Sequence, residues 1–139
     1  WLTCASVTVT CSGQASPRDG FVQYNFGSNW HAYVDGLLSE SPLSGVGLEA
    51  RLKSMSRHLQ EGFGLASFEG RTFLDVGSGS GMASLAAVAL NASRVISFDF
   101  QAASVETTRK LRRHVIEQTE FVTCTASVWE DVLQGSIVD

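Results

Sequence analysis

The stretch Thr72–Met82 reads Thr-Phe-Leu-Asp-Val-Gly-Ser-Gly-Ser-Gly-Met and decides the fold. Its first half, which ends at Val76, is rich in residues that favour β-strands. Three alternating glycines follow, and the run Met82–Leu90 after them is rich in helix-forming residues. A strand, a glycine turn and a helix in this order are typical of a parallel α/β unit that binds a nucleotide-like ligand at the start of the helix. A flexible Gly/Ser linker has a similar composition, but linkers lack such apolar flanks.

The spacing of Gly77, Gly79 and Gly81 narrows the class of ligand. Glycine tolerates positive φ and lets a ligand approach the backbone closely. The dinucleotide fingerprint is Gly-x-Gly-x-x-Gly, and its third glycine would fall on Met82. We therefore expect a ligand other than a nicotinamide or flavin nucleotide, and an NAD(P)-binding oxidoreductase domain is kept as an alternative.

An acidic residue, Asp99, ends a second apolar run at Arg94–Phe98, about 20 residues after Gly77. The carboxyl ends of neighbouring parallel strands meet at one edge of a sheet, so Asp99 is expected beside the glycine turn. There its carboxylate would accept hydrogen bonds from both hydroxyls of a ribose. The alternative is a helix-capping or surface aspartate.

Residues 73–81 and 95–99 together resemble the class I S-adenosylmethionine-dependent methyltransferases. The first block resembles their motif I, and Asp99 falls where their ribose-binding acid falls. Trp129–Asp139 resembles, more weakly, the strand end that holds adenine in these enzymes. Tyr24–Trp30 resembles an aromatic segment that precedes motif I in some small-molecule methyltransferases. The likeness covers roughly residues 21–139.

The resemblance implies an α/β fold with a Rossmann-like parallel sheet and flanking helices, and S-adenosyl-L-methionine as the cofactor. It also implies that the helix start after Gly81 suits the cofactor's carboxylate, because the first N–H groups of a helix have no partner within it. Asp75 would hold the turn or, through water, the cofactor's amino group, and the alternative is a purely structural hydrogen bond. Phe100 would be a wall against adenine or a core residue. The expected cofactor-binding residues are Asp75, Gly77, Ser78, Gly79, Gly81, Asp99, Phe100, Ser136 and Ile137.

Two segments compete for the third strand. Phe121–Thr125 has the spacing from Asp99 that the resemblance leads us to expect. Glu130–Gln134, followed by Gly135, has the better residue types. We prefer the second segment, which implies a long loop before it.

Two helices are expected before the first strand. Leu48, Leu52, Met55 and Leu59 recur at helical spacing. Upstream, Ser28 could cap a helix from residue 29 to residue 38. The aromatic rings of Tyr24 and Trp30 in this region either pack on the domain, which we favour, or cover the cofactor as a lid, one ring facing its sulfonium.

Composition excludes several classes of function. The net charge of −4 argues against a broad nucleic-acid interface. The basic cluster Arg109–His114 is then better explained by cations at the end of a helix. The longest apolar stretch is too short to span a bilayer. Three cysteines without a Cys-x-x-Cys pair fit a reducing compartment, so we expect a cytoplasmic protein.

The domain expectation is a leader or disordered segment at residues 1–20 and an incomplete methyltransferase domain at residues 21–139. The class I sheet has seven strands and only about three are expected here, so we interpret the chain as the cofactor-binding half, truncated and inactive alone. Without a fourth strand the first one would be an exposed edge, which favours aggregation. Expressed alone, the chain should aggregate or melt without cooperativity, and a sharp reversible transition would count against truncation.

The expected function is methyl transfer from S-adenosylmethionine to a small-molecule acceptor. No residue can be named as the catalytic base. Besides the oxidoreductase, the remaining alternative is a non-catalytic Rossmann-like domain that binds a partner.

Overall fold

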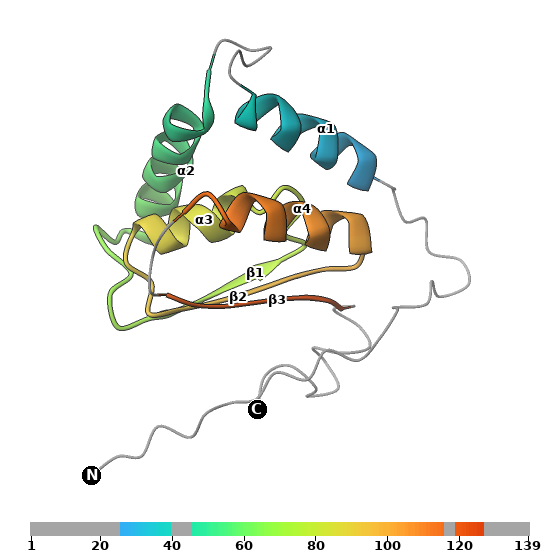
Figure 1. Ribbon diagram of the computed structural model, residues 1–139. Coiled ribbons are helices and arrows are strands. Elements are labelled where there is room, and N and C mark those ends of the chain that lie inside the picture. The colour runs from blue at the N-terminus through green and yellow to red at the C-terminus, as the bar shows by residue number, and fades with distance from the viewer. Residues whose placement is uncertain (1–25, 40–45, 116–118, 127–139) are drawn as a thin grey trace.

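The computed structural model describes residues 26–39, 46–115 and 119–126. These residues form four helices and three strands, and from the first strand onwards strands and helices alternate (Figure 1). Such alternation is the hallmark of parallel α/β folds. The elements are α1 (Gly27–Leu38), α2 (Leu48–Phe63), β1 (Thr72–Val76), α3 (Met82–Ala89), β2 (Arg94–Asp99), α4 (Ala102–Arg112) and β3 (Glu120–Thr125).

The three strands form one parallel sheet in the order β1-β2-β3. Leu74 of β1, Ile96 of β2 and Val122 of β3 lie in one row across it. The central strand is buried at four consecutive positions, Val95–Phe98, as is typical of strands in parallel sheets. The expected Rossmann-like α/β fold is therefore confirmed.

The preferred assignment of the third strand was wrong. β3 is formed by Glu120–Thr125, and it pairs with β2 from Arg94 opposite Glu120 to Asp99 opposite Thr125. The rival segment was preferred for its residue types, whereas Phe121–Thr125 has the expected spacing from Asp99. Pairing with β2 outweighs that local preference, since strand propensity depends strongly on context. The rival segment, residues 130–134, lies outside the described residues.

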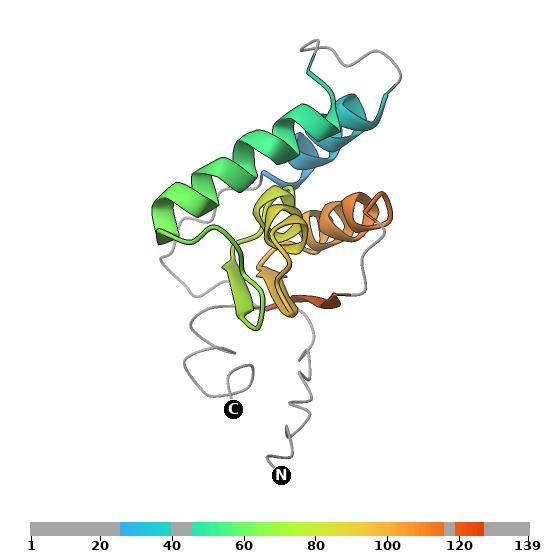
Figure 2. The ribbon, with the colours of Figure 1, turned by 90° about the vertical axis from the view of Figure 1, so that its left-hand side faces the viewer.

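All four helices lie on the same side of the sheet, as Figures 1 and 2 show. Helices α3 and α4 pack directly on the strands, whereas α1 packs on α4 and α2 packs on α3 in an outer layer. Most of α2 therefore lies one layer away from the strands. Its last residue, Phe63, does reach β1, where its ring lies 6.1 Å from that of Phe73.

The ends of α1 and α2 follow different rules. The expected cap of α1 by Ser28 was wrong, because the helix begins at Gly27 and Phe26 occupies the cap position without a side-chain hydrogen bond. The end of α2 is formed by a glycine. Gly64 adopts φ 65° and its N–H donates to the carbonyl of Gln60, which is the usual glycine termination of a helix.

Buried apolar clusters join these layers. One ties α3 to the first two strands and includes Val88 and Val95. Another ties α1 to α3 and α4 through Val34, Leu85 and Leu111, all of which are fully buried. Because Val34 is completely inaccessible, α1 is an integral part of the fold.

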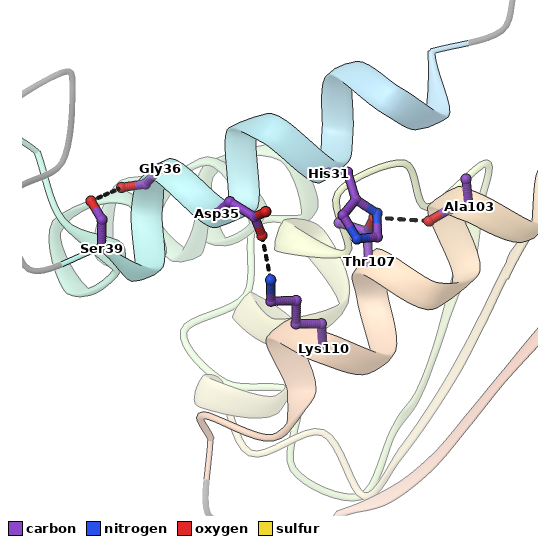
Figure 3. Close-up of polar contacts among 7 residues, drawn as sticks. All are labelled: His31, Asp35, Gly36, Ser39, Ala103, Thr107 and Lys110. Carbon is purple, nitrogen blue, oxygen red and sulfur yellow. Dashed lines mark hydrogen bonds and ion pairs between the residues drawn. The ribbon is translucent and has the colours of Figure 1, made fainter.

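The basic residues at the end of α4 contact neighbouring elements, in addition to placing cations at the end of a helix. Lys110 forms an ion pair with Asp35 of α1, and its hydrogen bond lowers the pKa of the Asp35 carboxyl (Figure 3). Arg109 donates to the carbonyl of Thr123 at 3.2 Å. The guanidinium of Arg112 lies 5.4 Å from the centre of the Phe121 ring. These contacts hold α4 to α1 and β3.

In the parts of the chain that the structure describes, no helix has the length and apolar character that crossing a membrane requires.

Candidate functional site

The turn after β1 has the backbone conformation that its glycines predict. Gly77, Gly79 and Gly81 have φ values of 73°, 53° and 81°. Residues with a Cβ atom rarely adopt this region, so the three glycines are required by the path of the chain. The N–H groups of Gly77 and Ser78 both donate to the carbonyl of Phe98, at 2.9 and 3.0 Å, and they hold the turn against the end of β2.

The surroundings of the three glycines differ. A Cβ atom on Gly77 would meet nothing within 4 Å, so this backbone borders open space. A Cβ atom on Gly81 would lie 2.7 Å from Oγ1 and 2.9 Å from Cα of Thr108. A Cβ atom on Gly79 would lie 3.0 Å from the indole of Trp30. Gly81 and Gly79 therefore allow α4 and α1 to pack closely, whereas Gly77 leaves its side of the turn open.

Asp99 lies beside the glycine turn, as the meeting of parallel strand ends predicts. Its Oδ2 accepts a hydrogen bond from the N–H of Gly79 at 2.9 Å. Its Oδ1 accepts one from the N–H of Gln101 at 2.8 Å. A carboxylate has about four acceptor positions, so these two bonds orient the group and leave capacity for two further donors. The geometry is compatible with accepting hydrogen bonds from a pair of hydroxyl groups.

Asp75 is half-buried and faces α3. It accepts a hydrogen bond from the hydroxyl of Ser84 and another from the N–H of the same residue. Burial raises the pKa of the Asp75 carboxyl and the negative charge of Asp99 adds to that increase, while the bonds from Ser84 oppose it. Asp75 thus makes a structural hydrogen bond. Its carboxylate also accepts from one N–H group in the first turn of α3, where the carboxylate of the cofactor was expected to bind.

Replacing Asp75 with asparagine is expected to stabilise the protein at pH 7. A carboxyl whose pKa is raised on folding lowers stability above its folded-state pKa, and this penalty disappears as the pH falls below the ordinary value of 3.8. The asparagine side chain would keep an acceptor for Ser84, so Asp75→Asn should add about 0.5–2 kcal/mol to the free energy of unfolding at pH 7.

Urea unfolding of both proteins at pH 7 and pH 4 measures this difference. The advantage of the variant should shrink at the lower pH, where the wild-type carboxyl is closer to neutral. A variant that is less stable at pH 7, or a difference independent of pH, would show that the buried charge carries no penalty.

Of the other expected site residues, two lie in the described part of the chain and two do not. The hydroxyl of Ser78 lies 3.3 Å from Oγ1 of Thr108, so this side chain contacts α4. Phe100 is half-buried and follows Asp99 directly. Ser136 and Ile137 lie outside the described residues.

Sequence reasoning missed Thr108 and undervalued Trp30. Both side chains contact glycines of the turn from helices that are distant in the sequence. The glycines indicate that another group can approach the turn closely, because a glycine that is not needed for a ligand is often needed for close packing, but they do not identify the residue that does so.

Metal-binding groups and a second hollow also bear on where a ligand could bind. In residues 26–39, 46–115 and 119–126, no group of His, Cys, Asp or Glu is arranged to hold a metal ion. A hollow of about 470 Å³, lined by Phe63, Phe68 and Phe73 among others, lies at the amino end of β1. The glycine turn is at the carboxyl end of that strand, so the hollow is separate from the candidate site.

Comparison with known proteins identifies the family. Residues 55–136 match the family model described as ribosomal protein L11 methyltransferase (PrmA), whereas no curated protein and no solved structure matches. The expectation of a small-molecule acceptor is contradicted, because the matched family is named for a protein acceptor. The match spans more than half of the chain and includes the glycine turn and Asp99. The chain therefore belongs to the ribosomal protein L11 methyltransferase (PrmA) family, which is a class I S-adenosylmethionine-dependent methyltransferase family.

Proposed function

We propose that this chain binds S-adenosylmethionine between the glycine turn and Asp99 and transfers its methyl group to a nucleophile on a ribosomal protein. The observation that supports this most is the 2.9 Å hydrogen bond from the N–H of Gly79 to Asp99, because it holds an acceptor carboxylate at the same turn in which the backbone of Gly77 borders open space. The bound cofactor would supply a methyl group already activated on a sulfonium. The ribosomal-protein acceptor rests on the family match.

Several of the expected site residues would each have a defined task. The remaining acceptor positions of Asp99 would take the two ribose hydroxyls. The open side of Gly77 would let the adenosyl group lie against the main chain. Asp75, held by Ser84, would attract the cofactor's ammonium group while its own charge is retained. Ser136 and Ile137 are proposed at the adenine, and this placement rests on the resemblance alone.

The chain's main contribution to the reaction would be positioning. Holding donor and acceptor in line removes much of the entropic barrier, so no covalent help from the protein is needed. A general base contributes only if the acceptor must lose a proton during transfer.

We propose the cytoplasm as the compartment. Cys124, a buried cysteine of the described part, is compatible with it.

A methyl-transfer assay tests the acceptor class. Purified ribosomal protein L11 and S-adenosylmethionine carrying a labelled methyl group would be incubated with the full-length protein. We expect label in the L11 band, and none when the L11 protein is omitted. Saturable cofactor binding without label in L11 would contradict the proposed acceptor while leaving the cofactor site standing.

A further inference from the structure

Helix α1 places an aromatic ring directly on the glycine turn. Cε2 and Nε1 of Trp30 would each lie 3.0 Å from a Cβ atom on Gly79, so the indole is in contact with that backbone. The ring of Tyr33 supports it edge-on, with centroids 6.2 Å apart and planes at 78°. Trp30 is therefore half-buried, with its indole packed against the turn.

The residue under this ring is the one that orients Asp99. Gly79 is buried, and its N–H donates to Oδ2 of Asp99 at 2.9 Å. A hydrogen bond to a charged group is worth more where water is kept away from it. The indole covers Gly79, and by excluding water there it strengthens the bond that holds the carboxylate.

The position of Trp30 is set by contacts on the next turns of α1. Val34 and Leu37 anchor the helix in the core. His31 Nδ1 lies 3.0 Å from Oγ1 of Thr107, whose hydroxyl is 2.8 Å from the carbonyl of Ala103 (Figure 3). Because Thr107 has one hydroxyl proton and gives it to Ala103, His31 is the donor of its bond.

The ion pair of Asp35 with Lys110 follows one turn after His31 (Figure 3). Together with the bond to Thr107 it ties α1 to α4, and α4 in turn packs on Gly81 through Thr108. The turn is thus held between two helices: Thr108 contacts its end and Trp30 contacts its middle.

We infer that Trp30 is a positioning residue of the cofactor site, which holds Gly79 and thereby the Asp99 carboxylate in the arrangement that receives the ribose. The inference rests on the proposed function, since it assigns a part of the same site. It goes beyond that function because it makes α1 necessary for cofactor affinity.

A double-mutant cycle in the full-length protein tests this role. The affinity for S-adenosylmethionine would be measured by calorimetry for wild type, Trp30→Ala, Asp99→Ala and the double variant. If Trp30 acts through Asp99, Trp30→Ala should weaken binding about tenfold in the wild-type background and less than about twofold when Asp99 is already absent. Phe26→Ala, which removes a half-exposed ring from the start of the same helix, is the control and should change affinity less than about twofold.

Equal loss in both backgrounds, or no loss in the wild-type background, would overturn the role of Trp30, because a general structural effect does not depend on Asp99. Trp30→Phe keeps a ring over Gly79 and should restore most of the affinity. If Trp30→Ala does not fold, Trp30→Leu replaces it in the same cycle and is judged by the same two ratios. A wild-type protein that binds no S-adenosylmethionine would refute the proposed function itself, which is a different result from an unaffected Trp30 variant.

Discussion

Gly81→Ala should destabilise the protein by about 2–5 kcal/mol, the largest stability loss that we expect from a single methyl group. Gly81 has φ 81°, where an alanine is strained. The added Cβ would also lie 2.7–2.9 Å from three atoms of Thr108, one of them in the backbone of α4. This steric overlap could be relieved if α4 moved away from the turn. The midpoint and slope of urea unfolding measure the loss.

The chain offers a matched control on α2. A Cβ atom on Gly62 would meet nothing within 4 Å, and this glycine is in a helix with ordinary φ. Gly62→Ala should therefore stabilise the protein by about 0.5–1 kcal/mol. Thr108→Ala should recover part of the loss in Gly81→Ala, because two of the three close atoms belong to that side chain. Similar effects at both glycines would mean that the close contact between α4 and the turn does not exist.

Asp99→Ala should weaken the binding of S-adenosylmethionine by about 1–3 kcal/mol, which is about 5- to 150-fold in the dissociation constant. The variant removes the acceptor that the ribose hydroxyls would need. It also leaves the N–H groups of Gly79 and Gln101 without the carboxylate that accepts from them. We therefore expect a loss of stability together with the loss of affinity.

Glu106→Ala is the control for Asp99→Ala, because Glu106 is an exposed acid on α4 and its removal changes the net charge equally. It should leave both affinity and stability nearly unchanged. Calorimetric titration of the full-length proteins would compare them. An affinity that is unchanged in Asp99→Ala would remove Asp99 from the site.

The first strand, the turn and the helix after it could be predicted because their signals are local. Phe73 and Val76 favour a strand, the glycines permit positive φ, and Met82–Leu90 favours a helix. These three local signals indicate the same strand–turn–helix unit. Asp99 could be placed beside the turn because parallel strands bring their carboxyl ends together. That placement needed the order of the elements along the chain and no knowledge of individual tertiary contacts.

The contacts that position the turn could not be predicted from the sequence. Thr108 and Trp30 reach Gly81 and Gly79 only because α4 and α1 fold back over the turn. Nothing in the spacing of these residues marks such pairs. The choice of Glu130–Gln134 as the third strand was wrong for a related reason. The third strand is determined by its pairing with β2, which is also a contact between segments distant in the sequence.

The error about the acceptor has a different origin. Motif I and Asp99 describe the cofactor side, which methyltransferases of different substrates share. The hint of a small molecule came from Tyr24–Trp30, and the described part of that segment belongs to α1 and its cap, where Trp30 packs on the turn. The acceptor class therefore came from the family match.

The most direct measurement is a pair of calorimetric titrations of the full-length protein, one with S-adenosylhomocysteine and one with NADH. S-Adenosylhomocysteine keeps the ribose and the amino-acid group of the cofactor but has no methyl group to transfer, so it reports binding alone. We predict saturable binding of S-adenosylhomocysteine that Asp99→Ala weakens, and no binding of NADH. Saturable binding of NADH, with no heat from S-adenosylhomocysteine, would contradict the assignment of this turn to a methyl donor.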